Sequence, residues 1–158
     1  MAKSLVSALD YLHNDLNIVH RDIKPQNIMI DEAGNPLLVD FGKSKQLRSI
    51  EDDQTTSMEG TYTFLPPECC SFDSNLYSMK KADIWALGIT LYILTFNNFP
   101  FETGSTELDL LSNICDFSLS FGGREISADL RHLLSLMLEK DPSRRGSLMD
   151  LKNSRFLN

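Results

Sequence analysis

Two short polar motifs flank a pair of apolar runs near the start of the chain, and this arrangement most constrains the fold. The motifs are HRDIKPQN (residues 20–27) and DFG (residues 40–42). Between them, residues 28–30 and 37–39 are apolar and are separated by turn-forming residues, which predicts a β-hairpin. Because antiparallel strands return the chain, we expect the end of the first motif and the start of the second to lie side by side.

The two motifs supply side chains suited to phosphoryl transfer, a reaction that depends mostly on positioning and charge neutralisation. Asp22 is the candidate general base, because a loop carboxylate can accept the proton of a substrate hydroxyl group. Lys24 would point to the same side of an extended loop and could neutralise the transferring phosphoryl group. Asn27 and Asp40 offer oxygen ligands of the kind that Mg²⁺ takes together with phosphates. Each residue alone would be an ordinary turn former or surface residue, so the prediction depends on their joint spacing.

The composition fits a soluble globular protein of one domain. Hydrophobic residues make up 42% of the 158 residues, and the net charge is −7, which favours neither nucleic acid nor an anionic membrane as a partner. The three cysteines lack C-x-x-C spacing, which is typical of reduced thiols and of a cytoplasmic or nuclear protein. The longest apolar run, residues 84–96, is shorter than the roughly 20 residues of a membrane span, so we predict a buried helix there.

Helical spacing of apolar residues dominates the rest of the chain. It predicts helices over residues 2–14, 83–96 and 106–115, another that starts at Ser127, and a short one after Ser147. We expect Leu108, Leu111 and Ile114 to form the apolar face of the third helix. Residues 43–65 show little periodicity, and a segment of this kind is usually functional or disordered.

The ordered motifs resemble those of the eukaryotic-type protein kinase family. The H-R-D-x-x-x-x-N and D-F-G motifs match its catalytic and metal-binding loops. GTYTFLPPE (residues 60–68) resembles its peptide-positioning loop, DIWALG (83–88) the start of its central large-lobe helix, and DPSRR (141–145) the segment before its last helix. The resemblance implies that residues 1–158 form the C-terminal lobe of a protein kinase domain, mainly α-helical with a small β-hairpin.

The resemblance also implies roles for particular residues. By this resemblance the catalytic residues would be Asp22, Lys24, Asn27 and Thr61. The residues in contact with ATP would be Lys24, Met29 and Asp40, and the Mg²⁺ ligands would be Asn27 and Asp40. Glu68 and Arg145 would form a buried ion pair, and Asp83 would brace the backbone of the catalytic loop.

Lys24 together with Thr61 is the family's Ser/Thr-specific pattern. The implied reaction is therefore transfer of the γ-phosphoryl group of ATP to serine or threonine hydroxyl groups of protein substrates. FNNFPF (residues 96–101) resembles the calcium/calmodulin-dependent kinase kinase branch of the family.

Arg21, directly before the candidate base, implies control by phosphorylation. An upstream kinase would modify Ser57, or its neighbours Thr56 or Thr55, and the phosphate would pair with Arg21 and Lys45. The alternative is a flexible polar loop that carries no switch.

The family's Gly-rich phosphate loop and strand lysine have no counterpart in this sequence. The resemblance places Met1 inside the helix that leads to the catalytic loop, so we expect a truncated catalytic half without the N-terminal lobe, inactive alone. Phe41 would then be left uncovered. The alternative is a catalytically inactive lobe fragment that acts as a binding or regulatory module. A small-molecule kinase of the choline or aminoglycoside type ranks last, since it would not explain residues 60–68.

Overall fold

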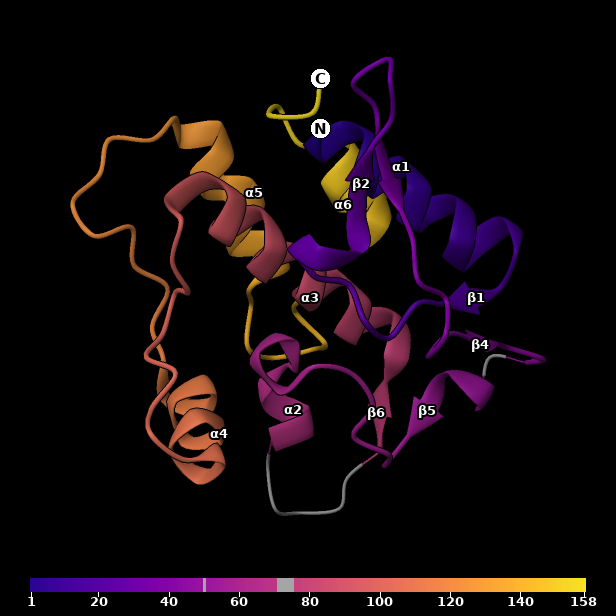
Figure 1. The fold of residues 1–158 in the computed structure, drawn as a ribbon, viewed down its shortest axis with the longest axis horizontal. Coiled ribbons are helices and arrows are strands. Elements are labelled where there is room, and N and C mark those ends of the chain that lie inside the picture. The colour runs from indigo at the N-terminus through magenta and orange to yellow at the C-terminus, as the bar shows by residue number, and fades with distance from the viewer. Residues whose placement is uncertain (50, 71–75) are drawn as a thin grey trace.

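The computed structural model describes residues 1–49, 51–70 and 76–158, and its helices gather around a central helix, α3 (Figure 1). Helix α5 packs against α3, α6 packs against α1, and α4 packs against α2. The two termini lie close together above the helices in Figure 1. The helices are α1 (Ala2–Asp10), α2 (Pro67–Cys70), α3 (Met79–Phe96), α4 (Glu107–Asp116), α5 (Ala128–Met137) and α6 (Leu148–Lys152).

Helix α3 is apolar on nearly all sides because α5 and the segments 18–19, 25–27 and 62–64 pack against it. Trp85, Leu87 and Ile89 are fully buried. The helix begins at Met79 rather than at the predicted residue 83, because the hydroxyl of Ser78 accepts the Lys81 backbone N–H at 3.1 Å and caps it. The predicted buried helix is thus confirmed, and no helix in the described part of the chain is long and apolar enough to cross a bilayer.

Helices α3 and α5 approach each other closely at Gly88. A Cβ atom at this position would lie 2.8 Å from the Cβ of Met137 and 2.8 Å from a methyl group of Leu138. The missing side chain therefore sets the spacing between the two helices.

The other predicted helices are present. The first continues beyond α1 as a π-helical turn at Tyr11–Asp15. Ser127 caps α5 as predicted, and Ser147 caps α6. The predicted apolar face of α4 is wrong in one residue: Leu108 is 64% exposed. Leu110, Leu111 and Ile114 are buried instead, since their spacing places them together on one helix face.

The strands form small antiparallel pairs. The predicted hairpin is confirmed: β2 (Ile28–Ile30) pairs with β3 (Pro36–Leu38). Two further pairs occur in or beside the segment expected to be irregular. β1 (Ile18–Val19) pairs with β4 (Lys45–Gln46), and β5 (Gln54–Thr55) pairs with β6 (Tyr77–Ser78). The first pair holds residues 45–46 against the strand that precedes the 20–27 loop. The second pair holds residues 54–55 against the two residues that precede α3.

Candidate active site

A carboxylate from α3 fixes the shape of the 20–27 loop. Asp83 is buried and accepts the backbone N–H groups of His20 and Arg21, each at 2.8 Å. The oxygen that accepts the His20 N–H, Oδ2, also contacts Nε2 of His13 at 2.8 Å. Arg21 has a φ of +65°, so the backbone turns sharply just before Asp22. The predicted brace of the loop by Asp83 is confirmed.

Three residues predicted to act in catalysis meet at the carboxylate of Asp22. The Lys24 ammonium donates to its Oδ2 at 2.9 Å, and the Thr61 hydroxyl donates to its Oδ1 at 2.7 Å. Lys24 also donates to Thr61 Oγ1 at 2.9 Å, which closes a triangle of contacts. Asn27 supports the same residue, because its side-chain amide donates to the Asp22 backbone carbonyl oxygen at 2.8 Å and to Oδ2 of the carboxylate at 3.3 Å.

The surroundings of Asp22 favour its charged form. Burial raises the pKa of this carboxyl group, but hydrogen bonds from Lys24 and Thr61 and the positive charges of Lys24 and Lys43 outweigh burial. The pKa of Asp22 therefore lies below its ordinary value, and the group is ionised at neutral pH.

Lys43 is a member of this site that our sequence reasoning missed. Its ammonium nitrogen lies 3.6 Å from Oδ2 of Asp22. Its carbonyl oxygen accepts a hydrogen bond from Nε of Arg21, which fixes its backbone. The predicted hairpin indicated this position, because it returns the chain at residues 40–42 to the 20–27 loop and Lys43 follows directly.

Asn27 and Asp40 lie at adjacent ends of the hairpin, as predicted. The backbone N–H of Val39 donates to the carbonyl oxygen of Asn27 at 3.0 Å, so pairing continues up to the residue before Asp40. Asp40 is exposed, and its Oδ1 accepts the Gly42 N–H at 3.2 Å. Neither the Oδ1 of Asn27 nor the Oδ2 of Asp40 is hydrogen-bonded to a described residue.

An apolar surface borders these two residues. Met29, predicted to contact ATP, is 59% exposed, and Phe41 is 44% exposed. The Phe41 ring lies 5.0 Å from the ring of His20. Ile30 and Leu37 of the hairpin are also exposed, which is unusual for four large apolar side chains on neighbouring segments.

The predicted phosphorylation segment is held by acidic residues. Lys45 Nζ donates to the Asp52 side chain at 2.9 Å and to its carbonyl oxygen at 3.0 Å. Ser57 and Thr56 are exposed, and the Ser57 hydroxyl donates to Glu59 at 3.2 Å. Lys45, expected to pair with a phosphate, is therefore bound to Asp52 in this structure.

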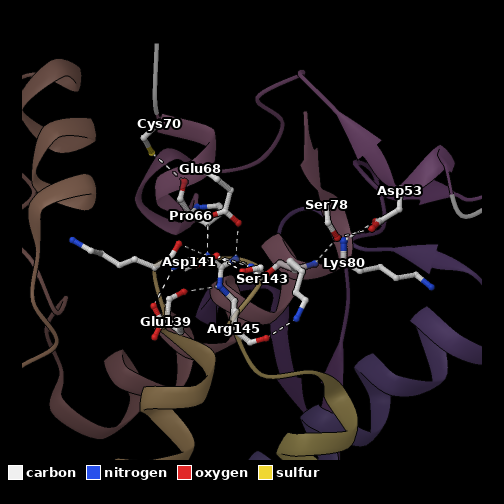
Figure 2. A network of polar contacts seen from close by, with 12 residues as sticks. Asp53, Pro66, Glu68, Cys70, Ser78, Lys80, Glu139, Asp141, Ser143 and Arg145 are labelled. Atoms are coloured by element: carbon white, nitrogen blue, oxygen red, sulfur yellow. Dashed lines mark hydrogen bonds and ion pairs between the residues drawn. The ribbon is translucent and has the colours of Figure 1, made fainter. Parts of the chain in front are cut away.

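The predicted ion pair between Glu68 and Arg145 is confirmed (Figure 2). Two parallel contacts of 2.6 and 2.7 Å join the guanidinium to the carboxylate. The Arg145 side chain is 0% exposed, lies over the Trp85 ring and donates to the carbonyl oxygens of Lys81 and Glu139. One side chain thus connects α2, α3 and the segment before α6.

The described structure is thus a mainly helical fold with a braced loop, in which a carboxylate, a lysine and a threonine meet beside a D-F-G motif. The family model "Protein kinase domain" matches residues 1–157, and the chain belongs to this family.

Its relatives include several serine/threonine kinases. The chain is 39% identical to "Serine/threonine-protein kinase ppk34" of Schizosaccharomyces pombe over 98% of its length and 42% of the relative's. It is 37% identical to "Serine/threonine-protein kinase stk11 homolog" of Dictyostelium discoideum, over 96% and 25% of the two chains. It is also 37% identical to "Calcium/calmodulin-dependent protein kinase kinase cmkC" of Emericella nidulans, over 95% and 28%. The chain therefore spans less than half the length of these relatives.

Proposed function

We propose that this chain is the C-terminal, catalytic part of a protein serine/threonine kinase, which transfers the γ-phosphoryl group of ATP to hydroxyl groups of protein substrates. The observation that carries this proposal is the joint contact of Asp22 with Lys24 and Thr61. The printed names of the relatives support serine and threonine as the acceptors.

The residues around Asp22 have complementary tasks in this reaction. Asp22 is ionised and oriented, so it can accept a hydrogen bond from the substrate hydroxyl group and then take its proton. Lys24 and Lys43 place two positive charges at the point where negative charge develops. Thr61 holds one oxygen of Asp22 and leaves the carboxylate in a single orientation.

Asn27 and Asp40 fit a magnesium ion that arrives with the nucleotide. They offer the amide Oδ1 of Asn27 and the carboxylate Oδ2 of Asp40, which are hard ligands, and neither of these two atoms has a partner in the described part of the chain. The described residues hold no group of three or more acidic, histidine or cysteine side chains able to bind a metal. The two-residue site of Asn27 and Asp40 suits Mg²⁺, because this ion keeps several waters and takes phosphate oxygens as further ligands. When bound, the ion would neutralise phosphate charge.

The exposed apolar surface at the hairpin supports a nucleotide above Met29. We infer that the adenine of ATP covers Met29 and that an N-terminal lobe covers Phe41. On this proposal the isolated chain transfers phosphate negligibly, because only one side of the nucleotide would be held.

Control by an upstream kinase is proposed at Ser57. The side chain is exposed, as a phosphorylation site requires, and Thr56 and Thr55 are neighbouring alternatives. A phosphate on Ser57 would have to displace Asp52 from Lys45 to gain this cation. In a protein that contains the whole kinase domain, unchanged activity of the Ser57→Ala variant would contradict this proposal.

The catalytic proposal is tested by removing the base. In a protein that contains the whole kinase domain, Asp22→Asn should lower transfer of labelled γ-phosphate to a peptide serine by about 10²–10⁴-fold. Asp129→Asn, an exposed carboxylate on α5, is the matched control and should leave the rate unchanged. Full activity of Asp22→Asn would overturn the proposal. Absence of transfer by the unaltered kinase domain would favour the alternative, a binding or regulatory module.

A further inference from the structure

The coil that joins α4 to α5 (Figure 1) packs on a cluster of aromatic side chains. The rings of Tyr92 and Phe96 from α3 lie 4.4 Å apart, and the Phe121 ring of the coil lies 6.0 Å from that of Phe96. The Tyr92 hydroxyl donates to the carbonyl oxygen of Ser120 at 2.8 Å. The coil is therefore anchored to the core although it has no regular structure.

A tight turn brings an arginine back over this cluster. Gly122 and Gly123 have φ values of +59° and +71°, a pair of conformations that favours glycine. The Arg124 N–H donates to the Phe121 carbonyl oxygen at 3.0 Å and closes the turn. The Arg124 guanidinium then lies 5.6 Å from the centre of the Phe96 ring and donates to the Phe96 carbonyl oxygen at 2.8 Å.

A second arginine approaches the cluster from α5. The Arg131 guanidinium lies 4.6 Å from the centre of the Phe121 ring. Neither Arg131 nor Arg124 forms an ion pair with any residue that the structure describes. Glu125 borders the same cavity, but none of the ion pairs between described residues joins it to either arginine. Two stacked cations thus remain available on an apolar floor.

The two arginines border an open cavity of about 720 Å³. Leu119, Phe121 and Ile126 supply its apolar lining, and it shares no residue with the surroundings of Asp22. This size lies within the range of roughly 300–1,000 Å³ that is usual for ligand sites.

We propose that this cavity binds an acidic peptide segment of a partner protein. Its carboxylates would pair with Arg124 and Arg131, and an apolar side chain would lie against Phe121 and Ile126. Stacking on the rings already restricts both guanidinium groups, so little side-chain entropy is lost when a carboxylate binds. The chain carries a net charge of −7, so a long polyanion would be repelled elsewhere, whereas a short acidic segment can stay within reach of Arg124 and Arg131, which outnumber Glu125 at this cavity.

The proposal can be tested with the chain itself, because it needs no catalysis. The probe is a fluorescein-labelled peptide of alternating glutamate and leucine, followed by fluorescence anisotropy. We expect saturable binding that weakens as sodium chloride is added. Arg131→Gln should weaken it about fivefold, the effect of one exposed ion pair at the upper end of its usual range. Arg155→Gln, an exposed arginine outside the cavity, is the matched control and should bind like the unaltered chain.

The test uses Arg131 because its side chain donates no hydrogen bond to a described residue, so its replacement should leave the fold intact. Arg124, in contrast, also donates to the Phe96 carbonyl oxygen. Circular dichroism of each variant should match that of the unaltered chain. Equal binding of a peptide with lysine in place of glutamate would overturn the proposal. So would the absence of peptide binding, displacement of the peptide by inorganic phosphate alone, or tighter binding to phosphatidylserine vesicles than to the peptide.

Discussion

At the scale of single residues, Asp22 shows how opposing forces set the charge of a buried carboxylate. Burial acts against ionisation, while Lys24, Thr61 and Lys43 act in its favour and prevail. Because the pKa of Asp22 is lower in the folded chain than in the unfolded chain, its ionised form stabilises the fold. This contribution is present above the unfolded pKa and is lost as the pH falls through the folded one.

The stability of the chain should therefore depend on Asp22 at acidic pH. The unaltered chain should lose stability relative to Asp22→Asn as the pH falls below about 4, where the unfolded carboxylate starts to bind protons. Urea unfolding followed by circular dichroism at a series of pH values measures this difference. If the free energies of unfolding of the two proteins changed in parallel with pH, the neighbours of Asp22 would not lower its pKa in the folded chain.

Lys43 is predicted to strengthen catalysis through charge, on the proposal that the chain is catalytic. In a protein with the whole kinase domain, Lys43→Met should lower kcat by roughly tenfold, less than the 10²–10³ of a directly bonded donor, since its nitrogen lies 3.6 Å away and is partly solvated. The acid limb of the pH profile should move to higher pH, because one charge that lowers the pKa of Asp22 is gone. Lys43→Arg should restore both, and Lys3→Met, an exposed lysine on α1, is the control.

At the scale of elements, the contact between α3 and α5 depends on an absent side chain. Gly88 lies in the middle of α3, where glycine costs helix stability, so its presence needs a compensating reason. Close packing against Met137 and Leu138 supplies that reason.

Adding one methyl group at this contact should force the helices apart. Gly88→Ala should reduce the free energy of unfolding by about 1–3 kcal/mol, despite the better helix propensity of alanine. Chemical denaturation measures the change. Ser135→Ala, at an exposed position of α5, is the control. A stabilised Gly88→Ala variant would mean that the two helices can adjust without cost.

The elements differ in how far the sequence reveals them. Helices could be predicted because their apolar spacing persists over several turns and serines cap them, as at Ser127 and Ser147. The pairs β1–β4 and β5–β6 could not, because strands of two residues show no periodicity. Leu108 was misplaced because its spacing to Leu111 is also helical, and only packing against α2 selects the buried face.

The candidate site was predictable to the extent that its residues share one segment. The spacing of Asp22 and Lys24 indicated their proximity directly. Thr61 is 39 residues from Asp22 and was assigned only through the family resemblance. The contact of Lys45 with Asp52 was not predicted, since nothing in a polar segment without periodicity says which carboxylate a lysine will meet.

At the scale of the whole molecule, Arg145 joins segments that are distant in the chain. It binds Glu68, which is 77 residues away, and carbonyl oxygens from α3 and from the turn after α5. Its charge is fully buried and has both a bidentate partner and additional acceptors, the conditions under which a buried ion pair is tolerated.

Removal of this arginine should destabilise the entire fold. Arg145→Met leaves the Glu68 carboxylate partly buried without its partner and should cost about 3–5 kcal/mol in free energy of unfolding. The neighbouring Arg144 is 74% exposed, so Arg144→Met is a matched control with an expected effect within about 1 kcal/mol. Thermal unfolding of both variants measures the two losses of stability. Equal losses would show that the ion pair with Glu68 stabilises the fold no more than the exposed Arg144 does.

The brace formed by Asp83 means that the HRDIKPQN loop is not a portable module. The loop owes its backbone path to a carboxylate that lies 63 residues beyond His20 and 62 beyond Arg21. A graft of the octapeptide onto another scaffold would carry the reactive side chains without the conformation that aims them. An engineer who wishes to move this chemistry must transfer α3 along with it, in register.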